Sequence, residues 1–301
     1  QSIHDKAVSR TREGLHYLGV SIFNHILSGR MDSMTVFLCE DSVCGILTGV
    51  YDAWDSRLGH ANVKLALKKG YQPEFFTDCL EVGPDAEKAD KVLRTLNRKM
   101  YLEDFEALYQ ALLSADDQKA DDIYRMIVLA LHTGKKLIHA LEHPTIFRIF
   151  RMARKTGREA GHCCEFLRFR ELEKGILFSV IAPQAQILAL IGEHFADRFP
   201  MEHFMIYDKT HQAMLVHEAG KEWVIWEHIE AFDETKLKLS DNEKKMSQGW
   251  QIFFDTIAIQ ERKNEKLQQQ LLPLKYRPYQ TEHLKKEEKC ALFSSFLRCS
   301  V

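Results

Sequence analysis

The fold is decided by residues 164–226, CEFLRFRELEKGILFSVIAPQAQILALIGEHFADRFPMEHFMIYDKTHQAMLVHEAGKEWVIW. This stretch opens with two runs that are typical of strands, CEFLRFREL (164–172) and GILFSVIAP (175–183). A charged turn that ends in Gly175 joins them. The two runs therefore predict a β-hairpin.

A helix and further strands follow the hairpin. After Pro183 the apolar residues recur at helical spacing, which predicts one amphipathic helix; they are Ile187, Leu190, Ile191, Phe195 and Phe199. Three more strand-like runs, EHFMIYD, QAMLVHE and EWVIW, are separated by polar turns. The predicted order is two strands, one helix and two or three more strands, which is an α+β fold with a mixed or antiparallel central sheet.

Composition limits the class of protein. Of the 301 residues 45% are hydrophobic and 28% are charged, which favours a folded chain over a disordered one. The net charge is −2, from 41 basic and 43 acidic residues, so nucleic-acid binding would need a local basic patch. Seven scattered cysteines favour a reducing compartment, and we expect a cytoplasmic protein. No run approaches the ~20 apolar residues of a membrane span, and the N-terminal stretch lacks the features of a signal peptide.

The rest of the chain is predicted to be mainly helical. We expect an N-terminal appendage of uncertain origin (1–30), a single large α+β domain (31–285) and a C-terminal tail (286–301). A strand, TVFLC, and a capped helix, VCGILTGVYDAW, open the domain, and residues 57–72 look irregular. Gly45 and Gly49 share one face of that helix, so another element could approach closely there; no phosphate-loop motif accompanies them. A large helical block follows, with helices over 85–99, 102–113 and 119–133.

The most informative helix for function is PTIFRIFRMARKTGREAGH (144–162). Its basic residues Arg148, Arg151, Lys155 and Arg158 recur at steps of three and four, with Arg154 beside them. Such a stripe could follow a phosphate backbone, because guanidinium groups pair with phosphates. The alternative is an ordinary solvated face. Arg168, with Arg170, extends the positive charge onto the hairpin that follows.

A second basic segment lies near the C-terminus. It follows a predicted helix whose apolar residues have core spacing; they are Met246, Trp250, Phe253, Phe254 and Ile257. The nucleic-acid contacts predicted from this segment are Arg262, Lys275, Tyr276 and Arg277. Tyr276 could stack on a base or could pack beside its own helix.

Three segments together resemble a known family. They are FLCEDSVCGILTGVYDAW (37–54), EFLRFRELEKGILFSVIAPQAQILALIGEHFADRFPMEHFMIYDKTHQ (165–212) and GWQIFFDTIAIQERKNEKLQQQLLPLKYR (249–277). They are similar to an uncharacterised domain family labelled "probable DNA metabolism protein". Its members are associated with a radical SAM DNA modification or repair protein and with uracil-DNA glycosylase-like fusions. The resemblance implies a role in DNA repair or modification and no established reaction.

The resemblance also marks individual positions. Among them, His194 and Arg198 lie four apart and project from one helical face, and Asp208 ends a nearby strand. A histidine with a carboxylate partner can act as a general base, and an arginine beside it can hold a phosphate, so these three are the candidate catalytic residues. The alternative is an Arg-Asp pair that ties helix to strand. The family often has an arginine where this chain has Lys209 to His211.

Two functions from different classes remain open. In the first, the chain is an accessory protein that binds DNA through a basic surface and docks a repair or modification enzyme. In the second, it is itself a hydrolase or lyase that acts on nucleic acid. No metal site or cofactor is predicted, because the cysteine spacings do not suit a tetrahedral metal site. The C-x3-C-x2-C motif of radical SAM enzymes is absent, so such chemistry would belong to a partner.

Overall fold

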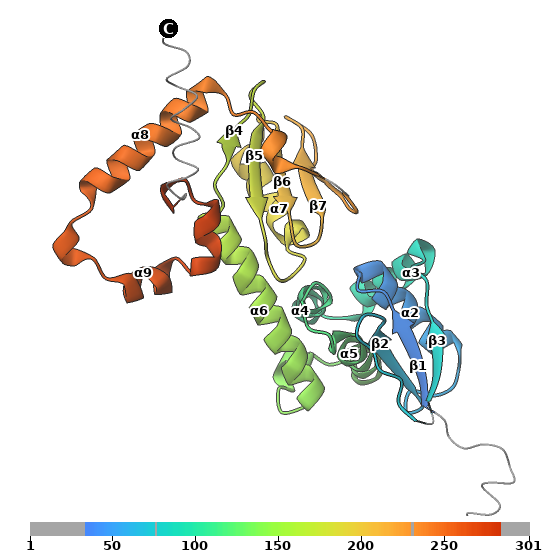
Figure 1. Ribbon diagram of the computed structural model, residues 1–301. Helices are drawn as coiled ribbons and strands as arrows, with labels where there is room; N and C mark the ends of the chain where they lie inside the picture. The colour runs from blue at the N-terminus through green and yellow to red at the C-terminus, as the bar shows by residue number, and fades with distance from the viewer. Residues whose placement is uncertain (1–33, 76, 230–231, 284–301) are drawn as a thin grey trace, which may run out of the picture. The chain divides into compact units, whose positions relative to one another are not determined.

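The computed structural model describes residues 34–75, 77–229 and 232–283 (Figure 1). The chain divides into two compact units. We call residues 1–108 with 117–149 the N-terminal unit, and residues 109–116 with 150–301 the C-terminal unit. The predicted α+β class is confirmed, because each unit combines a sheet with helices. The single domain expected over 31–285 stays a prediction, and the expected appendage and tail lie outside the described residues.

The N-terminal unit contains a parallel sheet with strand order β2-β1-β3. Its strands are β1 (Met34–Cys39), β2 (Val63–Leu67) and β3 (Thr77–Glu81). Strand β2 lies in the segment 57–72, so the expectation of irregular structure there was wrong for these five residues. The side chains of VKLAL alternate between buried and half-buried. The strand is only five residues long and lies among polar residues, so its alternating pattern is hard to detect in the sequence.

Helix α2 (Val43–Asp55) packs directly on β1. The Ser42 side chain caps it by accepting a hydrogen bond from the Gly45 amide at 2.9 Å. A Cβ atom on Gly49 would lie 2.2 Å from the Cys39 Sγ, so only glycine fits at this contact. The element that approaches closely at the glycine face of α2 is therefore β1, the strand that precedes this helix.

The predicted helical block is present. Helices α3 (Ala86–Lys99), α4 (Leu102–Leu112) and α5 (Lys119–Thr133) follow the first sheet in chain order. Helix α5 ends at Gly134, which has a φ of +57° and the left-handed conformation that favours glycine. The short 3-10 turns of the described chain are η1 (Leu137–His139), η2 (Glu234–Lys236), η3 (Gln260–Arg262), η4 (Leu274–Tyr279) and η5 (Thr281–His283).

The C-terminal unit contains the mixed sheet that residues 164–226 predicted, with strand order β4-β5-β6-β7-β8. Its elements are β4 (Arg170–Glu171), β5 (Leu177–Ile181), α7 (Leu188–Arg198), β6 (Phe204–Asp208), β7 (Ala213–His217) and β8 (Val224–Trp226). Strands β5 and β6 are parallel because α7 connects them, and the other neighbours are antiparallel. Helix α6 (Pro144–Phe166) runs further than expected, so the first arm of the hairpin is shorter than CEFLRFREL predicted.

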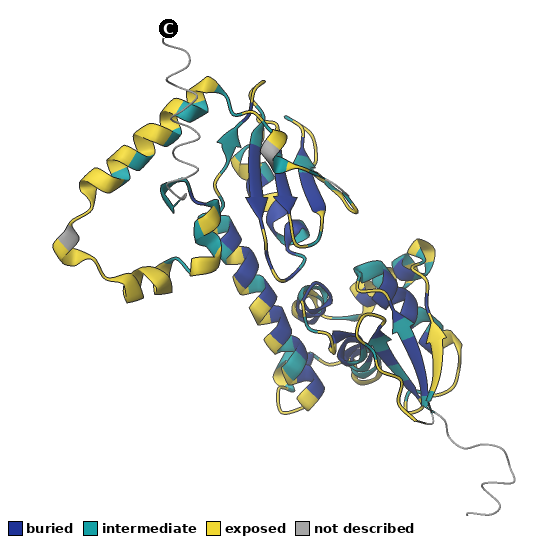
Figure 2. Ribbon diagram, in the orientation of Figure 1, coloured by how far each residue is buried: buried dark blue, intermediate teal, exposed yellow. Residues whose placement is uncertain are grey.

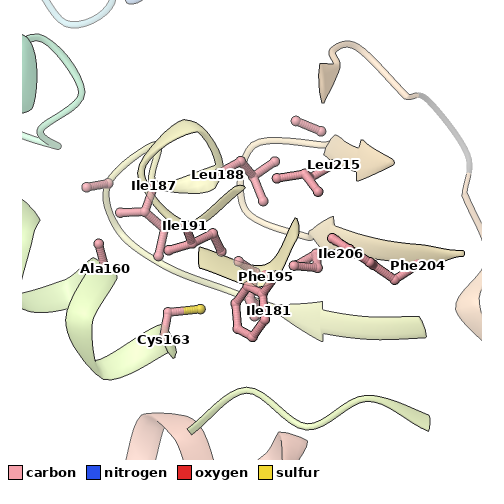
Figure 3. Close-up of a cluster of buried hydrophobic side chains, with 12 residues drawn as sticks. Ala160, Cys163, Ile181, Ile187, Leu188, Ile191, Phe195, Phe204, Ile206 and Leu215 are labelled. Atoms are coloured by element: carbon pink, nitrogen blue, oxygen red, sulfur yellow. The ribbon is translucent and has the colours of Figure 1, made fainter. Parts of the chain in front are cut away.

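One face of this sheet carries a core beneath α7 (Figure 3). Ile191 and Phe195 of α7 meet Phe204, Ile206 and Leu215 of the sheet, and all five side chains are buried. Helix α6 adds Ala160 and Cys163 to the same cluster. The apolar residues whose spacing predicted α7 are therefore the ones that pack in this core.

Helix α8 (Asp241–Ile257) differs from the expected core helix. None of its residues is buried, and it leads to α9 (Glu265–Leu271), which is exposed as well (Figure 2). We expected the apolar residues of α8 to be buried, and this expectation was wrong. Amphipathic spacing indicates that a helix has an apolar side, but not whether another element covers that side. Among the described residues, no helix has the length and apolar character needed to cross a membrane.

Candidate nucleic-acid interface

Helix α6 has one buried side and one exposed side (Figure 2), and its exposed residues include several cations. It begins at Pro144, whose missing amide hydrogen costs nothing at the first helical position. Its buried side chains recur at helical spacing and are Ile146, Ile149, Met152, Ala153, Thr156, Ala160 and Cys163. The basic residues are therefore held on the outer side by the burial of the inner one.

Four cations define what we call the α6 basic face: Arg151, Arg154, Lys155 and Arg158. All four are exposed, and none forms an ion pair with any residue that the structure describes. Like charges three and four residues apart on a helix repel one another by a few tenths of a kcal/mol per pair, roughly. An anion bound along this face would remove that repulsion.

Arg148 belongs to the same sequence stripe but has a different role. Its Nε donates a hydrogen bond to Oδ2 of Asp122 at 2.7 Å, and its Nη2 donates to Oδ1 of the same carboxylate. Asp122 is only 8% exposed. Arg148 is therefore committed to an internal two-point ion pair and is not part of the α6 basic face.

A cavity of about 270 Å³ lies beside the α6 basic face, within the C-terminal unit. Arg151 and Lys155 line it together with Thr156 and Glu159 of the same helix. Ser114, Asp116 and Gln184 are the other polar lining residues. The cavity thus combines hydroxyl groups, the carboxylates of Asp116 and Glu159, and two cations that have no ion-pair partner among the described residues, and these cations suit an anionic group that also accepts hydrogen bonds.

The negative charge of Glu159 in this cavity is already engaged. Its Oε2 accepts hydrogen bonds from the amides of Gln184 at 3.1 Å and Ala185 at 2.9 Å, and its Oε1 lies 2.5 Å from Nζ of Lys275. Burial alone would raise the pKa of Glu159, but the bonds from Lys275 and the two amides outweigh it and leave the pKa below its ordinary value. Lys275 is correspondingly not a free cation for nucleic acid.

This ion pair predicts a pH-dependent stability. A carboxylate whose pKa is lowered by folding stabilises the fold above its unfolded pKa of about 4.5, and that stability is lost as the pH falls through the lower folded value. Glu159→Gln should therefore cost about 1–2 kcal/mol at pH 7, a value discounted because Lys275 is half-exposed. Urea unfolding at pH 7 and at pH 3 should show the difference from wild type shrinking at pH 3. Glu165→Gln, an exposed change on the same helix, is the control, and an equal difference at both pH values would contradict the assignment.

The remaining predicted nucleic-acid contacts differ in their surroundings; they are Tyr276, Arg168, Arg262 and Arg277. Tyr276 packs against Phe166, with ring centroids 5.5 Å apart, and Nζ of Lys275 lies 4.8 Å from its centroid. Tyr276 thus packs against the end of α6, a helix other than its own η4. Arg168 is exposed, and its guanidinium donates to the carbonyl of Glu165. Of the remaining residues, Arg262 is exposed in η3 and Arg277 is half-buried in η4.

The three candidate catalytic residues do not share contacts. His194 and Arg198 are exposed on α7, whereas Asp208 is 1% exposed at the end of β6. The Asp208 carboxylate accepts hydrogen bonds from the Thr210 and His211 amides and lies 2.7 Å from Nδ1 of His211. His211, three residues after the aspartate, is thus its ionisable partner, and that spacing was the signal for it. A hydrolase or lyase site at these positions stays a prediction.

The two buried cysteines, Cys39 and Cys163, are poor candidates for nucleophiles. Burial, with a smaller contribution from Asp52, raises the pKa of Cys39 to about 12. Burial likewise raises the pKa of Cys163. A buried thiol with a raised pKa is largely unreactive. Within the part of the chain that the structure describes, no group of three or more His, Cys, Asp or Glu side chains is placed to hold a metal ion.

Fold and site together define an α+β protein with a mixed five-stranded sheet and a helix that exposes cations beside a polar cavity, with no ion-pair partner for them in the part of the chain that the structure describes. Residues 117–282 match a domain family of unknown function, DUF4130. Because the match covers more than half of the chain, the protein belongs to this family. The matched span includes α6, the whole mixed sheet and α8. No curated protein matches the chain.

Proposed function

We propose that this protein is an accessory factor of DNA repair or modification that binds nucleic acid through the α6 basic face. The observation that carries the proposal is a group of four exposed cations without ion-pair partners among the described residues, on a chain whose net charge is only −2. Phosphate contacts of this kind supply affinity without sequence specificity. The repair or modification context rests on the family resemblance described above.

The proposal includes a protein partner, for which a radical SAM or glycosylase-like enzyme is the class that the resemblance implies. Support comes from what we call the α8 apolar face: Met246, Trp250, Phe253 and Ile257. These side chains recur at steps of four, three and four, and each is roughly half exposed or more. Apolar side chains gathered on an exposed helix are typical of a surface that binds another protein.

A binding titration at two salt concentrations tests the nucleic-acid part. Fluorescence anisotropy would follow a labelled single-stranded and a labelled double-stranded oligonucleotide at about 50 and 200 mM salt. Four phosphate contacts predict that affinity for duplex falls about 150-fold over this range, and affinity for single strands about 50-fold, because each contact contributes ~0.9 or ~0.7 to the salt slope. An affinity that does not change with salt would refute binding through the α6 basic face.

A further inference from the structure

The N-terminal unit contains a separate cavity of about 680 Å³. Its floor is apolar and buried, and is formed by Val50, Ala53, Leu96 and Ile127. Most of the polar and aromatic side chains that line the cavity lie at its rim. The rim is formed by the end of α2, the turn after it and α3. A cavity of this size with an apolar floor and few polar groups has the composition of a small-molecule site.

Aromatic rings form one side of the rim. The Trp54 indole is 41% exposed and meets the His60 ring edge-on, with centroids 4.7 Å apart. His60 is fixed by a 2.8 Å hydrogen bond between its Nδ1 and the buried Tyr124 hydroxyl. Burial, with the nearby His132 and Arg125, lowers the pKa of His60, so the imidazole is neutral at pH 7. The rim therefore offers an ordered, uncharged aromatic surface on which a flat ring can stack.

Two cations complete the rim. Arg57 and Lys91 both line the cavity, and neither forms an ion pair with any described residue, whereas the neighbouring Lys88 pairs with Asp52 at 2.7 Å. One carboxylate, Asp55, lies on the same rim, so cations outnumber it two to one. The rim is thus suited to a ligand that carries negative charge.

Arg57 lies directly after Ser56, the C-terminal cap of α2. Its φ is +55°, in the left-handed region that costs a non-glycine residue roughly 1 kcal/mol. Gly59, two residues later, occupies the same region with a φ of +88°. Helices commonly end with a residue in this conformation, so the end of α2 accounts for the φ of Arg57 and places this residue at the cavity.

We propose that this cavity binds an aromatic anion: a planar ring that stacks at Trp54 and His60 and an attached negative group that pairs with Arg57 and Lys91. A mononucleotide and an aromatic carboxylate share this chemistry. The inference does not depend on the α6 basic face, because the cavity is built from other residues.

Calorimetric titration of the full chain with AMP, benzoate, adenosine and inorganic phosphate tests the proposal. AMP or benzoate should bind, and adenosine and phosphate should each bind at least about tenfold more weakly than the better of these two, because each lacks one of the two interactions. Preference for AMP identifies a nucleotide site and preference for benzoate a carboxylate site. If neither ligand binds up to about 5 mM, or if adenosine or inorganic phosphate binds as well as the better of the two, the proposal is wrong.

Two variants separate binding from folding. Arg57→Gly removes the guanidinium but keeps a residue that prefers positive φ, so the thermal midpoint should not fall while affinity for the preferred ligand drops about tenfold. Trp54→Leu should also weaken binding about tenfold by removing the ring. Arg98→Gln, an exposed change on α3 away from the cavity lining, should leave binding unchanged. Unaltered affinity in both Arg57→Gly and Trp54→Leu would overturn the assignment.

Discussion

Reversing two charges of the α6 basic face, by Arg151→Glu with Lys155→Glu, should weaken DNA binding about 50-fold or more at about 0.1 M salt. Both side chains are exposed, lack ion-pair partners among the described residues and line the same cavity. Losing two phosphate contacts should also lower the salt slope for duplex DNA by about 2, which anisotropy titrations at several salt concentrations would measure.

The same helix supplies the control for this experiment. Arg148→Gln removes a cation of the same sequence stripe, but one whose guanidinium is already bound to Asp122. This variant should lower the thermal midpoint, because Asp122 loses its partner, but should leave both the DNA affinity and the salt slope of the folded protein unchanged. The double reversal should stay close to the wild-type thermal midpoint, because both side chains are exposed, have no ion pair among the described residues to lose, and as glutamates would be attracted to Arg154 and Arg158. An unchanged affinity after the double reversal, or an equal loss in Arg148→Gln, would contradict the proposed interface.

Local patterns in the sequence were sufficient for most of the secondary structure. Helical spacing predicted α7, and the range 119–133 expected for a helix matches the bounds of α5. These features are set by residues within one or two turns of each other. Strand β2 was missed because a five-residue strand in polar surroundings has too little periodicity to detect.

Long-range pairing could not be predicted in this way. Arg148 and Arg151 look equivalent in the sequence, yet only Arg148 meets a carboxylate, which comes from another helix 26 residues earlier. Lys275 is engaged by Glu159, 116 residues away. Which basic residues remain available for a ligand depends on contacts of this kind, because a cation already held by a carboxylate gains little from a phosphate.

The cavity of the N-terminal unit was missed for a related reason. Trp54, His60 and Lys91 come from α2, the following turn and α3, so no short motif contains them. The Asp208 and His211 pair, in contrast, lies within one turn of chain and was accessible to sequence reasoning. The α8 apolar face is an intermediate case, since its spacing was recognised but its exposure was not.

The ion pair between Arg148 and Asp122 should be the largest single contribution to stability among the basic residues of α6. Arg148→Met would leave the nearly buried Asp122 carboxylate without its two-point partner and should cost about 2–4 kcal/mol in the free energy of unfolding. Combining it with Asp122→Asn should recover part of this loss, with a coupling of about 1–3 kcal/mol, because the amide no longer needs a counter-ion. Urea unfolding of the four proteins measures the cycle. Arg154→Met, a change of the same type at an exposed position of the same helix, should stay within about 0.5 kcal/mol of wild type. Additive losses in the double variant would mean that the two side chains stabilise the fold independently.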